Sequence, residues 1–159
     1  MIKKSSVAGI IHPADHPAMR SLGGAYRMAP IEDCEQHPAD EVVHDLIARD
    51  TASRELIRSM VLNTTAAWRA DLMKSVGRTA ANVAGDWGIG LVVAALRDTN
   101  AGVRDAALQA PENWRTSDAL KALKLHAPVE AVPMLQRYAM QLIKEIEDEL
   151  RWASGSDAW

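Results

Sequence analysis

The chain has 159 residues and a net charge of −3, with 48% hydrophobic and 25% charged residues, which is typical of one globular domain. Its basic residues are scattered and form no stripe that would neutralise phosphates, so we expect no nucleic-acid partner. The single Cys34 excludes an intrachain disulfide, and no apolar run is long enough for a membrane span, so we expect a reducing, cytoplasmic setting.

The N-terminal segment, residues 1–36, differs from the rest of the chain. Pro13, Pro17 and Pro30, together with the pair Gly23–Gly24, interrupt any long helix. We therefore expect a largely irregular arm with at most a short helix over residues 17–22.

From residue 37 onward, the sequence is rich in alanine and lacks the alternating pattern of strands, which favours an all-α domain. Apolar residues at helical spacing predict helices beginning at Pro38, over 56–61, after Thr64–Thr65, over 80–84 and 89–96, from Val103, and over 118–126. We expect three of them to end at Gly77, Gly85 and Pro111.

The last helix has the clearest pattern, over residues 133–152. Apolar side chains recur at three- and four-residue steps, charges lie opposite, and Glu147 and Arg151 are spaced for an ion pair. This pattern is typical of an amphipathic capping helix, with a dimerising coiled coil as the alternative. The domain would then cover residues 37–153, and 154–159 would form a tail.

Three segments share a rhythm of a short alanine-rich helix, a break, a tryptophan and a longer helix. The tryptophans are Trp68, Trp87 and Trp114, so the period varies from 19 to 27 residues. We interpret these tryptophans as equivalent positions of a small helical repeat.

Residues 96–108 read LRDTNAGVRDAAL, which resembles the HEAT repeat signature, in which Asp98 ends one helix and Val103–Arg104 opens the next. The continuation through Pro111 resembles the leucine-rich repeat variant, and the resemblance extends over residues 55–123. It implies a short right-handed α-solenoid of irregular HEAT-like repeats whose extended surface holds a protein partner. Asp98 would accept amide hydrogen bonds at the next helix, and Arg104 would pair with a neighbouring repeat. A helical bundle without repeats is the alternative.

The candidate partner-binding residues are the tryptophans and two adjacent arginines. Tryptophan and arginine are typical of binding hot spots, and the same tryptophans could instead pack between repeats. Both interpretations remain open for this set: Trp68, Arg69, Trp87, Trp114 and Arg115.

A duplicated His-Pro-Ala-Asp, at residues 12–15 and 37–40, is the only weak metal candidate. On a helix, His37, Asp40 and His44 would share one face, although His-Pro-x-Asp is also typical of a helix start. We favour the helix start and expect no metal, no cofactor and no catalytic residue.

The sequence therefore predicts a non-enzymatic protein-interaction module, an adaptor or a small inhibitor that occludes a larger protein. The alternatives are a self-assembling structural subunit, which would be a homo-oligomer, and a HEAT-like nucleic-acid-binding protein or DNA glycosylase.

Overall fold

A computed structural model describes residues 16–28 and 36–155, and within these ranges all regular structure is helical, as expected. The α-helices are α1 (Pro17–Met28), α2 (Pro38–Arg49), α3 (Thr51–Asn63), α4 (Ala66–Arg78), α5 (Ala81–Ala95), α6 (Ala101–Trp114), α7 (Ser117–His126) and α8 (Pro133–Ala153). A 3-10 turn, η2 (Ala127–Val129), links the last two. No helix of the described part of the chain is both long and apolar enough to cross a membrane.

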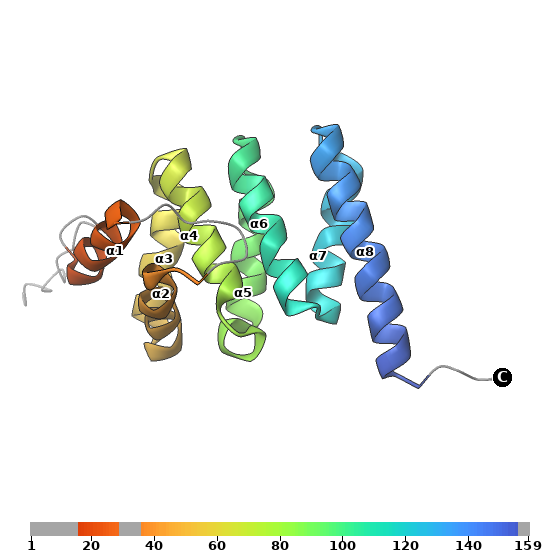
Figure 1. The fold of residues 1–159 in the computed structure, drawn as a ribbon, viewed down its shortest axis with the longest axis horizontal. Helices are drawn as coiled ribbons and strands as arrows, with labels where there is room; N and C mark the ends of the chain where they lie inside the picture. The colour runs from red at the N-terminus through yellow and green to blue at the C-terminus, as the bar shows by residue number, and fades with distance from the viewer. Residues whose placement is uncertain (1–15, 29–35, 156–159) are drawn as a thin grey trace, which may run out of the picture.

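The helices from α2 onward lie in two rows (Figure 1). Helices α4, α6 and α8 stand side by side, with α2 against α4, while α3, α5 and α7 form the second row. Each helix of the second row also contacts the next helix along the chain, which belongs to the first row. The closest and most extensive of all these contacts joins α4 to α6.

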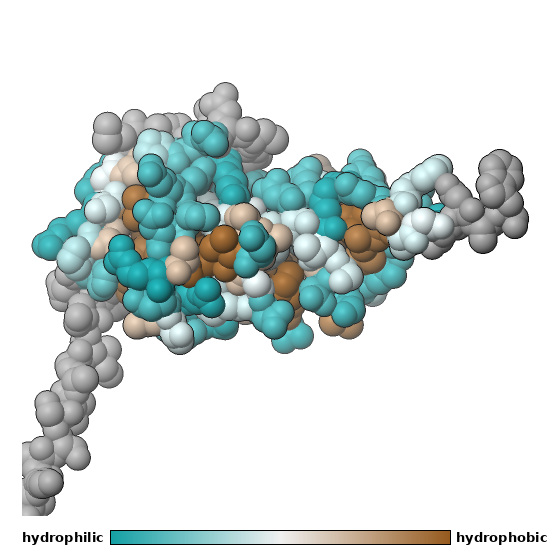
Figure 2. All heavy atoms as spheres, turned by 90° about the horizontal axis from the view of Figure 1, so that it is seen from below, coloured by the Kyte–Doolittle hydropathy of each residue, from teal (hydrophilic) through white to brown (hydrophobic). Residues whose placement is uncertain are grey.

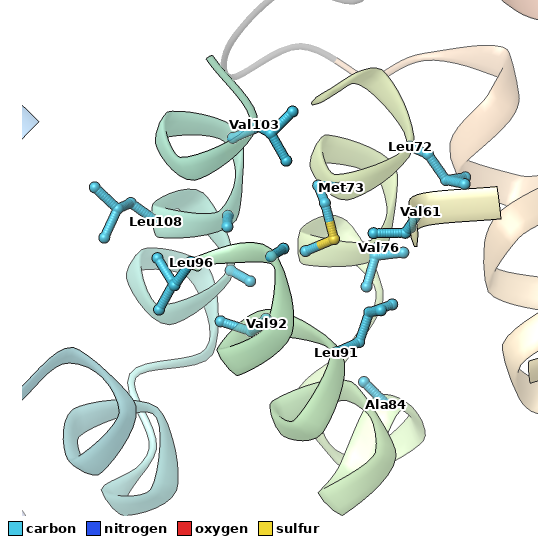
Figure 3. Packing of buried hydrophobic residues seen from close by; sticks show 14 of the residues in the cluster. Val61, Leu72, Met73, Val76, Ala84, Leu91, Val92, Leu96, Val103 and Leu108 are labelled. Carbon is cyan, nitrogen blue, oxygen red and sulfur yellow. The ribbon is translucent and has the colours of Figure 1, made fainter. Parts of the chain in front are cut away.

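Buried side chains of α4, α5 and α6 fill the space between the two rows (Figure 3). Leu72, Met73, Leu91, Val103 and Leu108 are all fully buried there. Burial of such side chains contributes about 1.5–3 kcal/mol each, so this layer carries much of the stability.

A glycine in the last turn of α4 permits the close contact with α6. We expected Gly77 to end the helix, but α4 continues to Arg78. A Cβ atom at Gly77 would lie 3.1 Å from both the Cα and the backbone N of Ala110. The residue is therefore glycine because two backbones meet there.

The expectation that Pro111 ends its helix is wrong. Helix α6 continues for a further turn to Trp114, and Arg115 follows in a left-handed conformation with φ of 49°. Side chains of this last turn are anchored on the end of α4: Trp114 Nε1 donates to the carbonyl of Thr79 (2.7 Å) and Asn113 Nδ2 to that of Gly77 (3.2 Å). These bonds satisfy carbonyls that the end of α4 leaves without helical partners, and they hold the turn that proline weakens.

Helix α1 is longer than expected, because it runs through Gly23 and Gly24 to Met28. Leu22 is fully buried, and a Cβ atom on Gly23 would lie 3.5 Å from the ring of Trp68. Packing against the domain therefore outweighs the low helix propensity of the two glycines.

The break expected at Gly85 is confirmed as a bend inside α5. Gly85 has φ of 53° and ψ of −152°, and the chain is helical on either side of it. After the bend, Gly88 faces the Trp114 ring, from which a Cβ atom would be 3.0 Å away.

Two arginines clamp consecutive pairs of helices together with the same geometry. Arg69 donates through Nε and Nη2 to the carboxylate of Asp98 (2.9 and 3.0 Å), and Arg104 does the same to Glu130 (2.9 Å for both bonds). The pairing expected for Arg104 is thus present. Asp98 also accepts the amide of Asn100, but Asn100 itself caps α6 by accepting from Gly102 and Val103.

Helix α8 has the amphipathic pattern expected of it, with Leu135, Ala139, Leu142 and Ile146 buried. Its ion pairs differ from the expected one. Glu147 pairs with Lys124 of α7, and Arg151 pairs with Asp148 at 3.4 Å.

The contact at Gly77 predicts opposite effects for two glycine-to-alanine substitutions. Gly77→Ala should destabilise the protein by about 1–3 kcal/mol, because the new methyl group meets the α6 backbone. Gly24→Ala is the matched control: nothing lies within 4 Å of its Cβ position, so it should stabilise α1 by up to about 1 kcal/mol. Urea denaturation of both variants measures this, and a Gly77→Ala protein as stable as the parent would contradict the packing argument.

The ion pair between Arg104 and Glu130 predicts that the stability of the protein depends on pH. Hydrogen bonds from Arg104, with that of the Val132 amide, lower the pKa of Glu130 from 4.5 to about 2, although burial raises it. Its stabilisation is therefore fully present above pH 4.5 and disappears as the pH falls towards 2. Glu130→Gln should cost about 3 kcal/mol at neutral pH, because Arg104 is left buried without its partner.

The difference in unfolding free energy between the parent and Glu130→Gln should shrink as the pH falls from 4.5 to 2. Glu147→Gln, which removes an exposed pair, should change stability little at any pH. A constant difference over that pH range would show that Glu130 is not the titrating group.

Candidate functional site

A groove of about 1250 Å³ lies between the start of α2, the end of α4 and one face of α6, with Tyr138 of α8 at its border. Its volume exceeds the roughly 300–1000 Å³ typical of small-molecule pockets. The groove is therefore our candidate functional site.

The α2 wall of the groove begins with a capping box. His37 Nδ1 accepts the amide hydrogen of Ala39 (3.1 Å), and Asp40 Oδ2 accepts that of His37 (2.9 Å). The His37 ring also stacks on Tyr26 of α1, with centroids 5.4 Å apart. These bonds fix the first turn of α2 at the rim.

The α4 wall joins this turn through an ion pair and joins α6 through hydrogen bonds. Arg78 Nη1 lies 3.3 Å from Asp40 Oδ2, and both side chains are largely buried. Since Asn113 and Trp114 bind the carbonyls of Gly77 and Thr79, three helices are held together along the groove.

The α6 wall presents a polar stripe: Asp105, Gln109, Glu112 and Asn113. Steps of four, three and one residue place these side chains on one helical face. Tyr138 donates to Glu112 Oε2 (2.5 Å), so the stripe is connected to α8. The stripe can bind main-chain amides and cations, since it combines carboxamides with carboxylates.

The candidate metal ligands do not form a metal site. His37 Nδ1 and Asp40 Oδ2 are engaged in the capping box, and within residues 16–28 and 36–155 no group of three or more side chains could hold a metal ion. The helix-start interpretation of His-Pro-Ala-Asp is thus confirmed at residues 37–40.

The other copy, residues 12–15, lies outside the described residues. A third His-Pro-Ala, at residues 16–18 directly after it, starts α1: His16 Nδ1 accepts the amide hydrogen of Ala18 at 3.1 Å, as His37 Nδ1 does that of Ala39.

The three tryptophans do not occupy equivalent positions. Trp68 is the third residue of α4, Trp87 lies inside α5, and Trp114 ends α6. The equivalent residues are instead Arg69 and Arg104. Each is the fourth residue of a first-row helix, and each makes the same clamp.

The predicted partner-binding residues all have contacts within the chain. The rings of Trp68 and Tyr26 pack edge to face with centroids 5.4 Å apart, and Trp87 packs against the core. Arg69 forms an ion pair with Asp98. Arg115 pairs with Glu145 and Glu149 of α8. These contacts favour packing between helices over an exposed ladder, and of the five residues only Trp114 lines the groove.

Sequence reasoning missed the groove residues Asp105, Gln109, Glu112 and Asn113. A signal was available, because these polar residues alternate with Val103, Ala106, Ala107 and Ala110 at helical spacing. A polar face alone is typical of any solvent-exposed helix, so only the placement of α2 and α4 beside it defines a groove.

The chain matches no protein-family model, no curated protein and no solved structure.

Proposed function

We propose that the chain is a non-enzymatic protein-interaction module, an adaptor or a small inhibitor, that holds a segment of another protein in the groove. The observation that carries this proposal is the groove itself. It is larger than a typical small-molecule pocket, and its walls are joined by the Arg78–Asp40 bond between α4 and α2 and by the bonds from Asn113 and Trp114 of α6 to the end of α4. A rigid site of this kind costs little ordering entropy when a partner binds.

The proposal includes a short right-handed α-solenoid of irregular HEAT-like repeats, with α8 as its capping helix. Arg69, Arg104 and Gln136 support it, because each is the fourth residue of a first-row helix and binds a carbonyl in the turn before that helix. They are 35 and 32 residues apart, which is the spacing of short helical repeats. We also propose that the protein is cytoplasmic.

A matched pair of alanine substitutions tests the groove without changing the charge. Ala80 is exposed and lines the groove, whereas Ala67 is exposed at the start of α4 and does not line it. Affinity capture with the full chain should recover a stoichiometric protein partner, and Ala80→Trp should weaken its binding about tenfold or more by filling the groove. Ala67→Trp should retain the partner.

Thermal unfolding of both variants is the control, and it should give the same cooperative transition as the parent. A partner that binds Ala80→Trp as tightly as the parent would place the interaction elsewhere and refute the proposed function.

Self-assembly is a second candidate, favoured by apolar side chains at the α7–α8 end. Leu125, Val129 and Met134 are 73%, 76% and 68% exposed, and Trp152 is 72% exposed. Such exposure is typical of contact surfaces when the side chains are contiguous. On the face seen in Figure 2, hydrophobic residues form separate patches in a hydrophilic surface.

Light scattering over a wide range of protein concentration separates the two candidates. We expect a constant molar mass. A mass that rises with concentration, and that Leu125→Glu returns to the monomer value, would favour the self-assembling subunit instead.

A further inference from the structure

The groove is acidic. Its lining carries four carboxylates, those of Asp40, Glu41, Asp105 and Glu112, against one arginine, Arg78, and two histidines, His37 and His44. Arg78 pairs with Asp40, and the described residues form no ion pair with Glu41 or Glu112, both of which are exposed. A concave acidic surface concentrates cations and repels phosphates.

Helix stability does not explain the acidic residue at the α6 end. Asp40 and Glu41 occupy the first turn of α2, where negative charge favours the helix. Glu112 instead lies in the last turn of α6, where negative charge opposes the helix dipole, and this turn has no basic residue. Its carboxylate is nevertheless positioned by the Tyr138 hydroxyl, which donates to it.

Asp40 supplies a second observation, from the α2 end of the groove. Its Oδ2 atom accepts hydrogen bonds from the His37 amide and from Arg78. Its Oδ1 atom is buried and accepts no hydrogen bond from the described residues. The negative charge of Asp40 is therefore only partly compensated by hydrogen bonds, and this carboxylate adds to the negative potential at the α2 end of the groove.

We infer that the occupant of the groove is a cationic, extended polypeptide segment, whose lysine or arginine side chains meet Glu41 at the α2 end and Glu112 at the α6 end. The inference rests on the proposed function and names the chemistry of its partner. Gln109 and Asn113 lie along the α6 wall, where carboxamides can bind the main chain of an extended segment. A nucleic acid does not fit, because its phosphates would face the four carboxylates.

The test uses the full chain and two labelled peptides, one repeating Gly-Lys-Ser-Arg and one with glutamate at each basic position. Fluorescence anisotropy should detect binding of the cationic peptide only, with an affinity that falls as salt is added. The double variant Glu41→Gln, Glu112→Gln should reduce the affinity about tenfold, because two ion pairs with the peptide are lost.

The matched control is Asp45→Asn, Glu55→Gln, which changes the net charge equally at two exposed positions outside the groove. It should bind the cationic peptide as the parent does. Equal losses in both double variants would show that overall charge attracts the peptide, and no binding to the parent would show that the groove does not select cations. Either result overturns the inference.

Two further results separate this inference from the proposed function. A captured partner that is lost with Ala80→Trp but kept by Glu41→Gln, Glu112→Gln would leave the module intact and refute the cationic segment. Retention by all variants would refute both. If Lys3→Glu, Lys4→Glu increases the affinity for the cationic peptide, the occupant is the N-terminus of this chain and the inference of a partner segment is wrong.

Discussion

The approach of α4 to α6 at Gly77 is the constraint on which the rest of the structure depends. Because no side chain separates the backbones there, Trp114 and Asn113 reach the carbonyls at the end of α4. The same contact brings the polar face of α6 beside Arg78, which in turn holds Asp40 of α2. The groove is therefore a consequence of helix packing, and its three walls cannot move independently.

The two arginine clamps are a second constraint, because they fix how consecutive helix pairs are oriented. Arg69 and Arg104 each form two parallel hydrogen bonds with a carboxylate located in the turn after the next second-row helix. A planar guanidinium in this arrangement fixes orientation as well as distance. The clamps set the spacing between consecutive helix pairs, while the apolar layer between the rows supplies most of the stabilisation.

The sequence predicted the elements whose signals are local. The helix beginning at Pro38 was predicted from the His-Pro-x-Asp pattern, and the helix over 118–126 and the apolar stripe of α8 were predicted from their spacing. In the structure, His37 and Thr116 cap α2 and α7, which begin at Pro38 and Ser117. The length of α1 and the continuation of α6 beyond Pro111 could not be predicted, because both depend on tertiary contacts, of Leu22 in the first case and of Trp114 in the second.

The tryptophans are the most conspicuous residues of this sequence, but they do not occupy equivalent positions in their helices. The shared position is defined by what Arg69 and Arg104 contact, and Trp68 corresponds there to Val103. The groove could not be predicted from the sequence either. Its acidic residues come from α2 and α6, 64 positions apart between Glu41 and Asp105, and only the intervening helices bring them together.

The succession of neighbouring helices also affects how the chain can reach this structure. The principal contacts join helices that are close in chain order, such as α4 with α6, α7 with α8 and α1 with α2. Few distant segments must find each other, so little loop-closure entropy opposes folding, and such topologies fold rapidly. Since α4 and α6 share the largest contact, we expect their pairing around α5 to form early in folding, before the flanking helices pack.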